Sequence, residues 1–263
     1  EGSLWVTPIN EPSFMAYAGG EVGLFAPWLT GRGFDLKVAL AEAAIAGIDA
    51  IRAVDPGARI VNVDPMCRVV PPAGRTDLDE VVDDFNERLV FQAWDMLCGR
   101  LLPELGGSSR HLDIIGINYY WTNQWEWGAP ANADGIVPPL EDGDPRCLSL
   151  QELVRLVWRR YGSEVMISET AHIGDRRASW VRELEICAND LTAEGIPLSG
   201  ICLYPIQSMP EWHNPEVWLP MGLWEPACEA NGNDRVFCGP MLRALEEAHA
   251  RSRFTVLPAG GEQ

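Results

Sequence analysis

The chain has 263 residues, of which 47% are hydrophobic, and both values are ordinary for a folded protein of one large or two small α/β domains. Its 38 acidic side chains exceed its 20 basic ones, which gives a formal net charge of −18. A surface this negative repels phosphate backbones and anionic lipids, so we expect no nucleic-acid and no membrane partner.

The seven cysteines are scattered along the chain and form no C-x-x-C pair. This usage predicts neither a disulfide framework nor a zinc site, and it fits a reducing, cytoplasmic compartment best. No apolar run is long enough to span a bilayer, and the first residues lack the basic-then-apolar pattern of a signal peptide. The chain opens with EGSLW, without an initiator methionine and close to a strand, so we expect it to be cut from a longer protein.

Short β-branched runs alternate with longer amphipathic patterns from the N-terminus onward. The predicted strands cover residues 4–9, 58–63, 112–120, 164–169 and 198–206. The predicted helices cover residues 35–54, 76–97, 149–161, 177–194 and 240–252. Two of these helices start at capping-box spacing, with Thr76 and Asp79 in one and Ser149 and Glu152 in the other.

This βα repeat, with strands that are apolar on both faces, predicts a parallel sheet. A (β/α)8 TIM barrel needs three strands more than the five visible ones, whereas a doubly wound open sheet does not. No G-x-G-x-x-G or P-loop follows the first strand, which disfavours a nucleotide-binding open sheet. The long stretches 121–148 and 207–239 follow strands, so they lie at the strands' C-terminal side, where barrels carry active-site loops.

Two carboxylates end predicted strands, Glu11 in TPINEP and Glu169 in VMISET. If both strands belong to one parallel barrel, these side chains share a rim and can face the same pocket. Glycoside hydrolysis requires such a pair, with one carboxyl protonated to donate to the leaving oxygen and one ionised to attack the anomeric carbon. The alternative interpretation is two unrelated rim residues, salt-bridged or solvated.

Polar neighbours of both carboxylates favour the catalytic interpretation. Asn10 is an amide suited to a sugar 2-hydroxyl beside the acid, and the alternation in GINYY places Asn118 and Tyr120 on one face at a strand's end. A phenol at that position can hydrogen-bond the attacking carboxylate and hold it ionised. The alternative for Tyr120 is a core tyrosine.

TPINEP resembles the NEP motif that carries the acid/base in retaining βα-barrel glycosidases, and the sequence is most similar to glycoside hydrolase family 1, the β-glucosidases and β-galactosidases. WVTPINEP resembles the family's W-x-T-x-N-E-P on barrel strand four, with one extra residue, and GLFAPWL at 23–29 is similar to the loop that follows. GINYY matches strand six, and ISETA resembles the T-E-N-G of strand seven, with Thr170 in place of the asparagine.

Strand eight of the family carries W-S-x-x-D-N-F-E-W, and YPIQSMPEW at 204–212 is similar in spacing. Tyr204 stands at the first tryptophan, and Glu211 and Trp212 stand at the last two positions, where the family grips sugar hydroxyls and stacks on the ring. The D-N pair is replaced by Ser208 and Met209.

The resemblance implies one domain over residues 1–263, the C-terminal five βα units of a (β/α)8 barrel without strands one to three. The open sheet edges then require a partner, either a missing N-terminal segment or a further copy in a homo-oligomer.

The resemblance also implies a retaining hydrolase of β-linked glucosides or galactosides, with a carbohydrate substrate and with no metal or organic cofactor. Glu11 would be the acid/base and Glu169 the nucleophile. The implied substrate-binding residues are Asn10, Asn118, Tyr120, Tyr204, Glu211 and Trp212.

Two other classes stay open at this point. The Thr170, Ser208 and Met209 departures favour a non-catalytic sugar-binding or scaffold relative. An open-sheet enzyme for a nucleotide or acyl substrate is disfavoured, because neither a phosphate loop nor a G-x-S-x-G elbow is present.

Six further side chains have both a functional and a structural interpretation. His172 and His213 lie near the motifs, but a lone histidine is more often structural. Asp64 ends the run IVNVDP and either orients Glu11 or caps a turn. The remaining three either stack on sugars or close a lid or core: Trp121, Trp125 and Trp127.

Overall fold

The computed structural model describes residues 3–130, 137–212, 214–227 and 234–251. The chain divides into two compact units, and the first comprises residues 1–169 with 197–202. The second unit comprises the remaining residues, 170–196 and 203–263.

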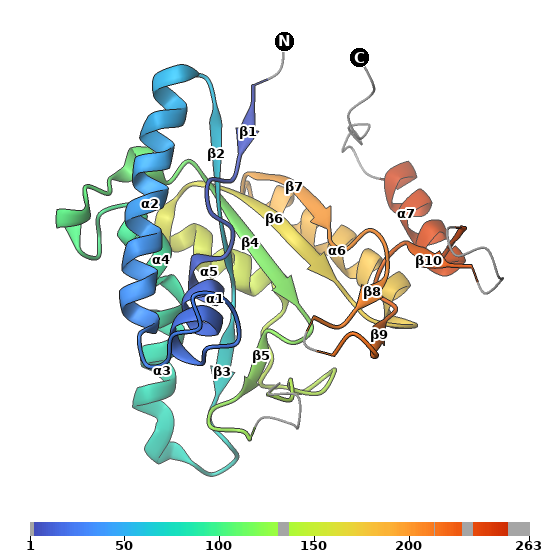
Figure 1. The fold of residues 1–263 in the computed structure, drawn as a ribbon. Coiled ribbons are helices and arrows are strands. Elements are labelled where there is room, and N and C mark those ends of the chain that lie inside the picture. The colour runs from blue at the N-terminus through green and yellow to red at the C-terminus, as the bar shows by residue number, and fades with distance from the viewer. Residues whose placement is uncertain (1–2, 131–136, 213, 228–233, 252–263) are drawn as a thin grey trace. The chain divides into compact units, whose positions relative to one another are not determined.

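A five-stranded sheet forms the centre of the first unit (Figure 1), in the order β1-β2-β4-β6-β7. Its strands are β1 (Trp5–Val6), β2 (Arg59–Pro65), β4 (Ile114–Tyr120), β6 (Glu164–Ala171) and β7 (Leu198–Leu203). β2 runs parallel to β1 and to β4, with Asp64 opposite Ile117. The arrows of β4, β6 and β7 also point the same way in Figure 1. The predicted parallel α/β sheet is confirmed.

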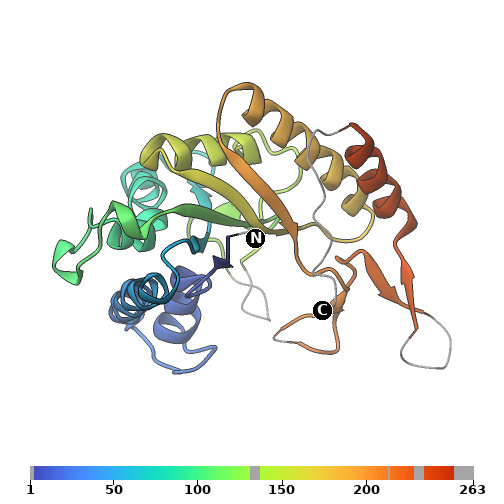
Figure 2. The same cartoon turned by 90° about the horizontal axis from the view of Figure 1, so that it is seen from above.

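Helices connect successive strands on one side of this sheet. β1 leads through α1 (Pro12–Met15), the π-helix η1 (Ala16–Glu21) and α2 (Gly33–Val54) to β2. Then α3 (Asp79–Glu87) and α4 (Gln92–Leu97) lead to β4, and α5 (Leu150–Tyr161) leads to β6. Short 3-10 helices lie between them: η2 (Thr76–Leu78), η3 (Leu89–Phe91), η4 (Pro103–Leu105) and η5 (Ser109–His111). Figure 2 shows the strands along an arc with α2, α4 and α5 on its outer side.

The core of this unit follows from the apolar runs in the strands and the apolar stripe of α2. The fully buried strand residues are mainly β-branched: Ile60, Ile114, Ile115, Ile117, Val165 and Ile167. The buried residues of α2 recur at helical spacing: Ala41, Ala44, Ile45 and Ile48. Because parallel strands covered by helices have no solvated face, these strands read as continuous apolar runs rather than as alternating ones.

The single helix predicted over 76–97 is wrong. The chain forms η2, α3, η3 and α4 there, with Arg88 outside helical geometry at φ −124° and ψ −57°. The Asn86 side chain accepts a hydrogen bond from the Val69 N–H at 3.0 Å and donates to the Val69 carbonyl at 2.9 Å. This pairing ties the last turn of α3 to β3, two residues before the break. Arg75, and not Thr76, occupies the N-cap position of η2, whereas the Ser149–Glu152 capping box of α5 is formed.

The predicted strand at 4–9 shortens to β1, because Pro8 has no N–H for the ladder. Two three-residue strands that the sequence pattern did not indicate also pair in parallel, β3 (Arg68–Val70) with β5 (Gln124–Glu126). Such short strands have too few residues for a recognisable period.

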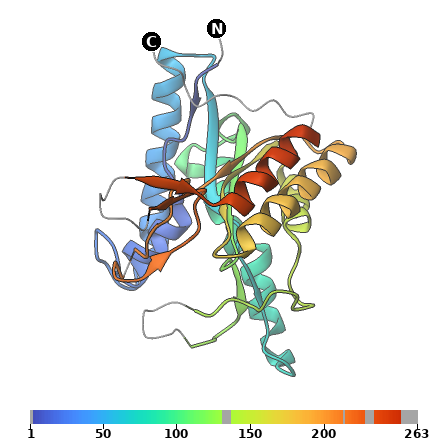
Figure 3. The same cartoon turned by 90° about the vertical axis from the view of Figure 1, so that its right-hand side faces the viewer.

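The second unit contains α6 (Arg176–Ala193) and α7 (Gly239–Arg251), which lie side by side in Figure 3. Their shared core consists of Ala178, Val181, Met241 and Ala244. Two antiparallel pairs occupy part of the stretch 207–239. They are β8 (Met209–Pro210) with β9 (Trp218–Leu219), and β10 (Trp224–Pro226) with β11 (Arg235–Phe237).

Candidate active site

Glu11 sits in an unusual backbone conformation just before α1. Its φ of 49° and ψ of 58° lie in the left-handed region, which costs a residue other than glycine roughly 1–2 kcal/mol. Hydrogen bonds hold it there on both sides, from the Glu11 N–H to the Val63 carbonyl at 3.1 Å and from the Met15 N–H to the Glu11 carbonyl at 2.9 Å. A strained residue that its surroundings fix in this way points to a role for its side chain.

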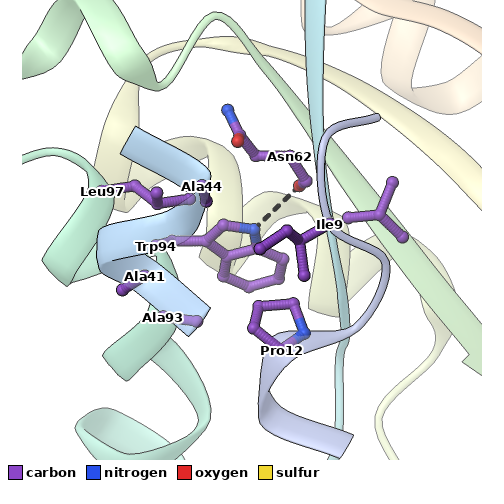
Figure 4. A pocket seen from close by; sticks show the side chains of 9 residues that line it. Ile9, Pro12, Ala41, Ala44, Asn62, Ala93, Trp94 and Leu97 are labelled. Atoms are coloured by element: carbon purple, nitrogen blue, oxygen red, sulfur yellow. Dashed lines mark hydrogen bonds between the residues drawn. The ribbon is translucent and has the colours of Figure 1, made fainter. Parts of the chain in front are cut away.

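Apolar packing supports this turn from behind. Figure 4 shows Ile9 and Pro12 beside the Trp94 indole, whose Nε1 donates to the Asn62 carbonyl at 3.0 Å. These side chains and their neighbours line a cavity of about 10 Å³. That volume has room for one water molecule at most, so the cavity belongs to the packing under the turn and is no substrate site.

Asn118 connects the Glu11 carboxyl to the sheet. This residue of β4 is fully buried, and its Nδ2 donates to Glu11 Oε1 at 2.9 Å. Its Oδ1 accepts the Ser168 hydroxyl of β6 at 2.7 Å. Because the amide oxygen is bound to Ser168, the NH₂ group is the side that faces Glu11.

Tyr120 holds the second carboxyl in the same manner. It follows Asn118 by two residues, and its hydroxyl donates to Glu169 Oε2 at 2.8 Å. Residues two apart on a strand share a face and lie roughly 7 Å apart. The structure therefore brings Glu11, Asn118, Tyr120 and Glu169 together at the C-terminal end of the sheet.

Burial controls the protonation of Glu11. Desolvation raises its pKa to about 7, the hydrogen bond from Asn118 opposes this rise, and the negative charges of Glu169 and Asp64 add to it. Among the described residues no ion pair reaches any of these three carboxyls. Glu11 can therefore hold a proton close to neutral pH, as a general acid must.

A third carboxyl lies behind this pair. Asp64 at the end of β2 is fully buried, and its Oδ1 accepts the Ser13 N–H at 2.9 Å. Desolvation raises its pKa to about 7, against the bonds from Ser13 and the positive charge of Lys37. Burial also raises the pKa of the Cys67 thiol to about 12, with further contributions from Asp64 and Glu11.

The sequence analysis missed several of these residues. Burial lowers the pKa of Lys37, and its Nζ donates to Gln92 Oε1 at 3.0 Å. The signal for it was present, since Lys37 precedes the apolar positions Ala41, Ala44 and Ile48 at helical spacing and so shares their inner face. For Ser13, Cys67 and Ser168 no local pattern exists.

Asn10 reaches the site through its backbone. It is exposed and forms an isolated parallel bridge to Val63, next to the Glu11 turn. Contact of its side chain with a sugar hydroxyl stays a prediction.

The predicted sugar-binding residues of the last strand belong to the second unit. Tyr204 is 41% exposed and donates its N–H to the Thr170 carbonyl at 3.1 Å. Glu211 Oε2 accepts the Asn214 N–H at 2.6 Å, and Trp212 is 62% exposed. The structure fixes these three within their own unit, so their role toward a sugar stays a prediction.

The departures from the family pattern have local structural reasons in the second unit. Thr170 is fully buried, and its Oγ1 accepts the Trp180 indole N–H of α6 at 3.0 Å. Ser208 Oγ accepts the Gly222 N–H at 3.0 Å. His172 is buried, its Nδ1 accepts the Ile173 N–H at 2.8 Å and its ring lies 5.9 Å from Trp180, which favours its structural interpretation.

Of the three tryptophans after β4, two contact the same ring. Trp125 and Trp127 each approach Phe85 of α3 edge-on, at 5.9 Å between ring centroids. Trp121 meets Tyr120 at 6.5 Å. The Phe85 contacts favour the core-or-lid interpretation for Trp125 and Trp127. His213 lies outside the described residues.

In the described part of the chain, no helix has the length and hydrophobicity needed to cross a membrane. Within the same residues, no group of three or more His, Cys, Asp or Glu side chains is placed to hold a metal ion.

Several solved structures with a similar fold are β-glucosidases. The chain is similar to a family 1 β-glucosidase from Thermotoga maritima, at 16% identity and a TM-score of 0.66 over 91% of this chain. It is similar to a hyperthermophilic β-glucosidase from Pyrococcus furiosus, at 19% identity and 0.68 over 94%. It is also similar to the AHE enzyme from Alicyclobacillus herbarius, at 19% identity and 0.67 over 92%. No protein-family model matches the sequence, and a search of the curated proteins finds no match.

The chain spans 54–62% of the length of these three structures. Its curved parallel sheet with outer helices therefore corresponds to part of a TIM barrel. The predicted fold class is confirmed, and the solved structures that are similar to the chain include a family 1 β-glucosidase, as the sequence resemblance predicted.

Proposed function

We propose that the chain carries the two catalytic carboxyls of a retaining β-glycosidase, with Glu11 as acid/base and Glu169 as nucleophile. The observation that carries this proposal is the pair of bonds from one strand: Asn118 donates to Glu11 and Tyr120 donates to Glu169. The similarity to β-glucosidases supports a β-linked glucoside as substrate, and a β-galactoside is the related possibility.

In the first half-reaction, Glu169 attacks the anomeric carbon as a carboxylate while protonated Glu11 donates its proton to the glycosidic oxygen. The bond between that oxygen and the anomeric carbon breaks, the alcohol leaves, and a glycosyl ester forms on Glu169. The Tyr120 hydroxyl stabilises the ionised form of Glu169 before attack, because it donates to that carboxylate.

In the second half-reaction, Glu11 changes its role. The ester removes the negative charge of Glu169, which is one of the causes that raise the pKa of Glu11. The pKa of Glu11 then falls, and its carboxylate accepts a proton from water as the water attacks the anomeric carbon and releases Glu169. One pair of partly buried carboxyls thus serves both steps.

The other predicted residues complete this proposal. Asn10 would contact the sugar 2-hydroxyl, and Asn118 would orient Glu11 toward the sugar. From the sequence resemblance alone, Tyr204, Glu211 and Trp212 are further candidates for sugar binding. A reducing, cytoplasmic location fits the scattered cysteines. A homo-oligomer or a further segment would complete the barrel, because the chain spans 54–62% of the matched structures.

The test is covalent trapping of the full chain with a 2-deoxy-2-fluoro β-glucoside that bears a dinitrophenyl leaving group. The electronegative fluorine slows breakdown of the ester, so intact mass should rise by one fluoroglucosyl group, and peptide mapping should locate it on Glu169. Folded protein that gains no mass from the glucoside or the matching galactoside contradicts the proposal.

A non-catalytic sugar-binding relative is the second candidate, since the chain covers only part of its neighbours' length. Saturable binding of glucose derivatives without adduct formation would favour it.

A further inference from the structure

Asp64 supplies the cap that the short helix after Glu11 lacks. Glu11 occupies the N-cap position of α1, yet its side chain makes no capping hydrogen bond, because its carboxyl faces Asn118. The first N–H groups of a helix have no acceptor within the helix. Pro12 has no N–H, and the Ser13 N–H is bound by Asp64 Oδ1 at 2.9 Å from the neighbouring strand β2. This cap leaves the Glu11 carboxyl free for the site.

Capping alone does not explain a carboxyl at position 64. Among the described residues, the second oxygen, Oδ2, is buried and has no hydrogen-bond partner within the distance limit. A buried and unsatisfied carboxyl oxygen is costly. Asparagine has the same shape and would accept the Ser13 N–H equally well. The acidic group itself therefore has an effect that an amide would not supply.

Three titratable groups are coupled electrostatically to this carboxyl, and a fourth, Glu169, acts on one of the three. Glu11 lies on the capped turn, Cys67 follows β2, Lys37 belongs to α2, and Glu169 acts on Glu11 from β6. The charge of Lys37 favours ionisation of Asp64, and the charges of Asp64 and Glu169 oppose ionisation of Glu11. Asp64 is thus coupled to the carboxyl in front of it.

We propose that Asp64 is a positioning residue for Glu11: it caps the turn that presents Glu11 to the site, and as a third carboxyl it sets the pH at which Glu11 loses its proton. The second part rests on the proposed function only in calling Glu11 the acid/base. The coupling between the two carboxyls does not depend on turnover.

The experiment is a carboxyl ¹³C NMR titration of the full chain labelled at Glu, with E11Q used to assign the Glu11 resonance. D64N keeps an acceptor for Ser13 and removes the acid, so the midpoint of the Glu11 titration should move to lower pH by roughly half a unit or more. D113N makes the same substitution at the opposite end of the sheet and should leave the midpoint in place. An unchanged midpoint in folded D64N overturns the proposal.

Kinetics separate this inference from the proposed function. With an aryl β-glucoside, D64N should shift the alkaline limb of kcat/KM to lower pH, and D64A, which also loses the cap, should lower kcat by roughly 10- to 100-fold with little change in KM. If the wild type has no turnover but the titration shifts, hydrolysis is contradicted and the role of Asp64 is supported. If turnover occurs and neither variant differs from the wild type in pH limb or kcat, Asp64 has no such role and the glycosidase proposal stands.

Discussion

The two ends of the central sheet treat acidic side chains in opposite ways. At the N-terminal end, Arg59 on β2 reaches Asp113 at 3.0 Å and Glu164 at 2.8 Å, and so links the starts of β2, β4 and β6. Partial burial alone would raise the pKa of Asp113, but the bonds from Arg59 and from the Ile60 N–H outweigh it and lower that pKa.

At the C-terminal end, Glu11 and Asp64 have raised pKa values, because they are desolvated and no ion pair among the described residues reaches them. Paired charges join strands and serve stability. Desolvated carboxyls that have no ion pair cost stability and hold a proton near neutral pH, which is the condition for acid/base chemistry. The end of the strand at which a carboxyl lies therefore indicates which task it has.

The largest effect expected from this comparison concerns the two glutamates of β6. E169Q removes the proposed nucleophile, so on that proposal kcat for an aryl β-glucoside should fall at least about 1,000-fold, equivalent to roughly 4 kcal/mol. The matched variant E164Q, at the other end of the same strand, should keep kcat within about twofold. Steady-state kinetics of both folded variants compares the two losses in kcat. Similar losses in E169Q and E164Q would refute the functional division of the sheet.

The desolvated carboxyls at the C-terminal end of the sheet should make the free energy of unfolding depend on pH. Asp64 has a folded-state pKa of about 7 against an ordinary value of 3.8, so the folded state retains its proton where the unfolded chain has lost it. The stabilisation from this proton is complete below about pH 4 and is lost as pH rises toward 7, a change of about 3 kcal/mol.

Urea unfolding of wild type and D64N at pH 4.5, 6 and 8 measures this term. The free energy of unfolding of D64N, relative to that of the wild type, should increase as pH rises. Parallel curves would show that Asp64 is not protonated in the folded protein.

Loss of the Arg59 ion pairs at the N-terminal end of the sheet should lower stability and leave the catalytic rate unchanged. R59A leaves Glu164 without its partner and Asp113 with only Arg52 at 3.6 Å, and the two carboxylate side chains are 28% and 21% exposed, so we expect a loss of about 2 kcal/mol in the free energy of unfolding. Activity per folded molecule should stay unchanged. R75A breaks the exposed pair with Asp77 and should leave the free energy of unfolding nearly unchanged. Loss of activity in folded R59A would count against the comparison.

The smallest expected effect tests how Asn118 is oriented. S168A removes the hydroxyl that binds Asn118 Oδ1, so the amide is free to turn its oxygen toward Glu11. We expect kcat/KM to fall by roughly 3- to 10-fold, about 1 kcal/mol. S163A, which removes a bond to the Leu112 carbonyl just before β6, serves as the control and should leave kcat/KM unchanged.

The sequence by itself determined the βα order, the parallel sheet and the two carboxylates at strand ends. Each of these depends on local periodicity: apolar runs mark buried strands, and alternation puts Asn118 and Tyr120 on one face. The capping box at Ser149 is local in the same sense, and it formed as predicted.

The tertiary structure decided which side chains meet. Asn118 and Glu11 are 107 residues apart in sequence, Asn118 and Ser168 are 50 apart, and Ser13 and Asp64 are 51 apart. The Asn86 side chain bonds the backbone of Val69, 17 residues earlier in the sequence. Local periodicity does not encode such pairings, because burial and charge coupling arise only when the strands lie side by side. For this reason the sequence located both carboxylates, whereas the raised pKa of Glu11 and the third carboxyl behind it emerged only from the fold.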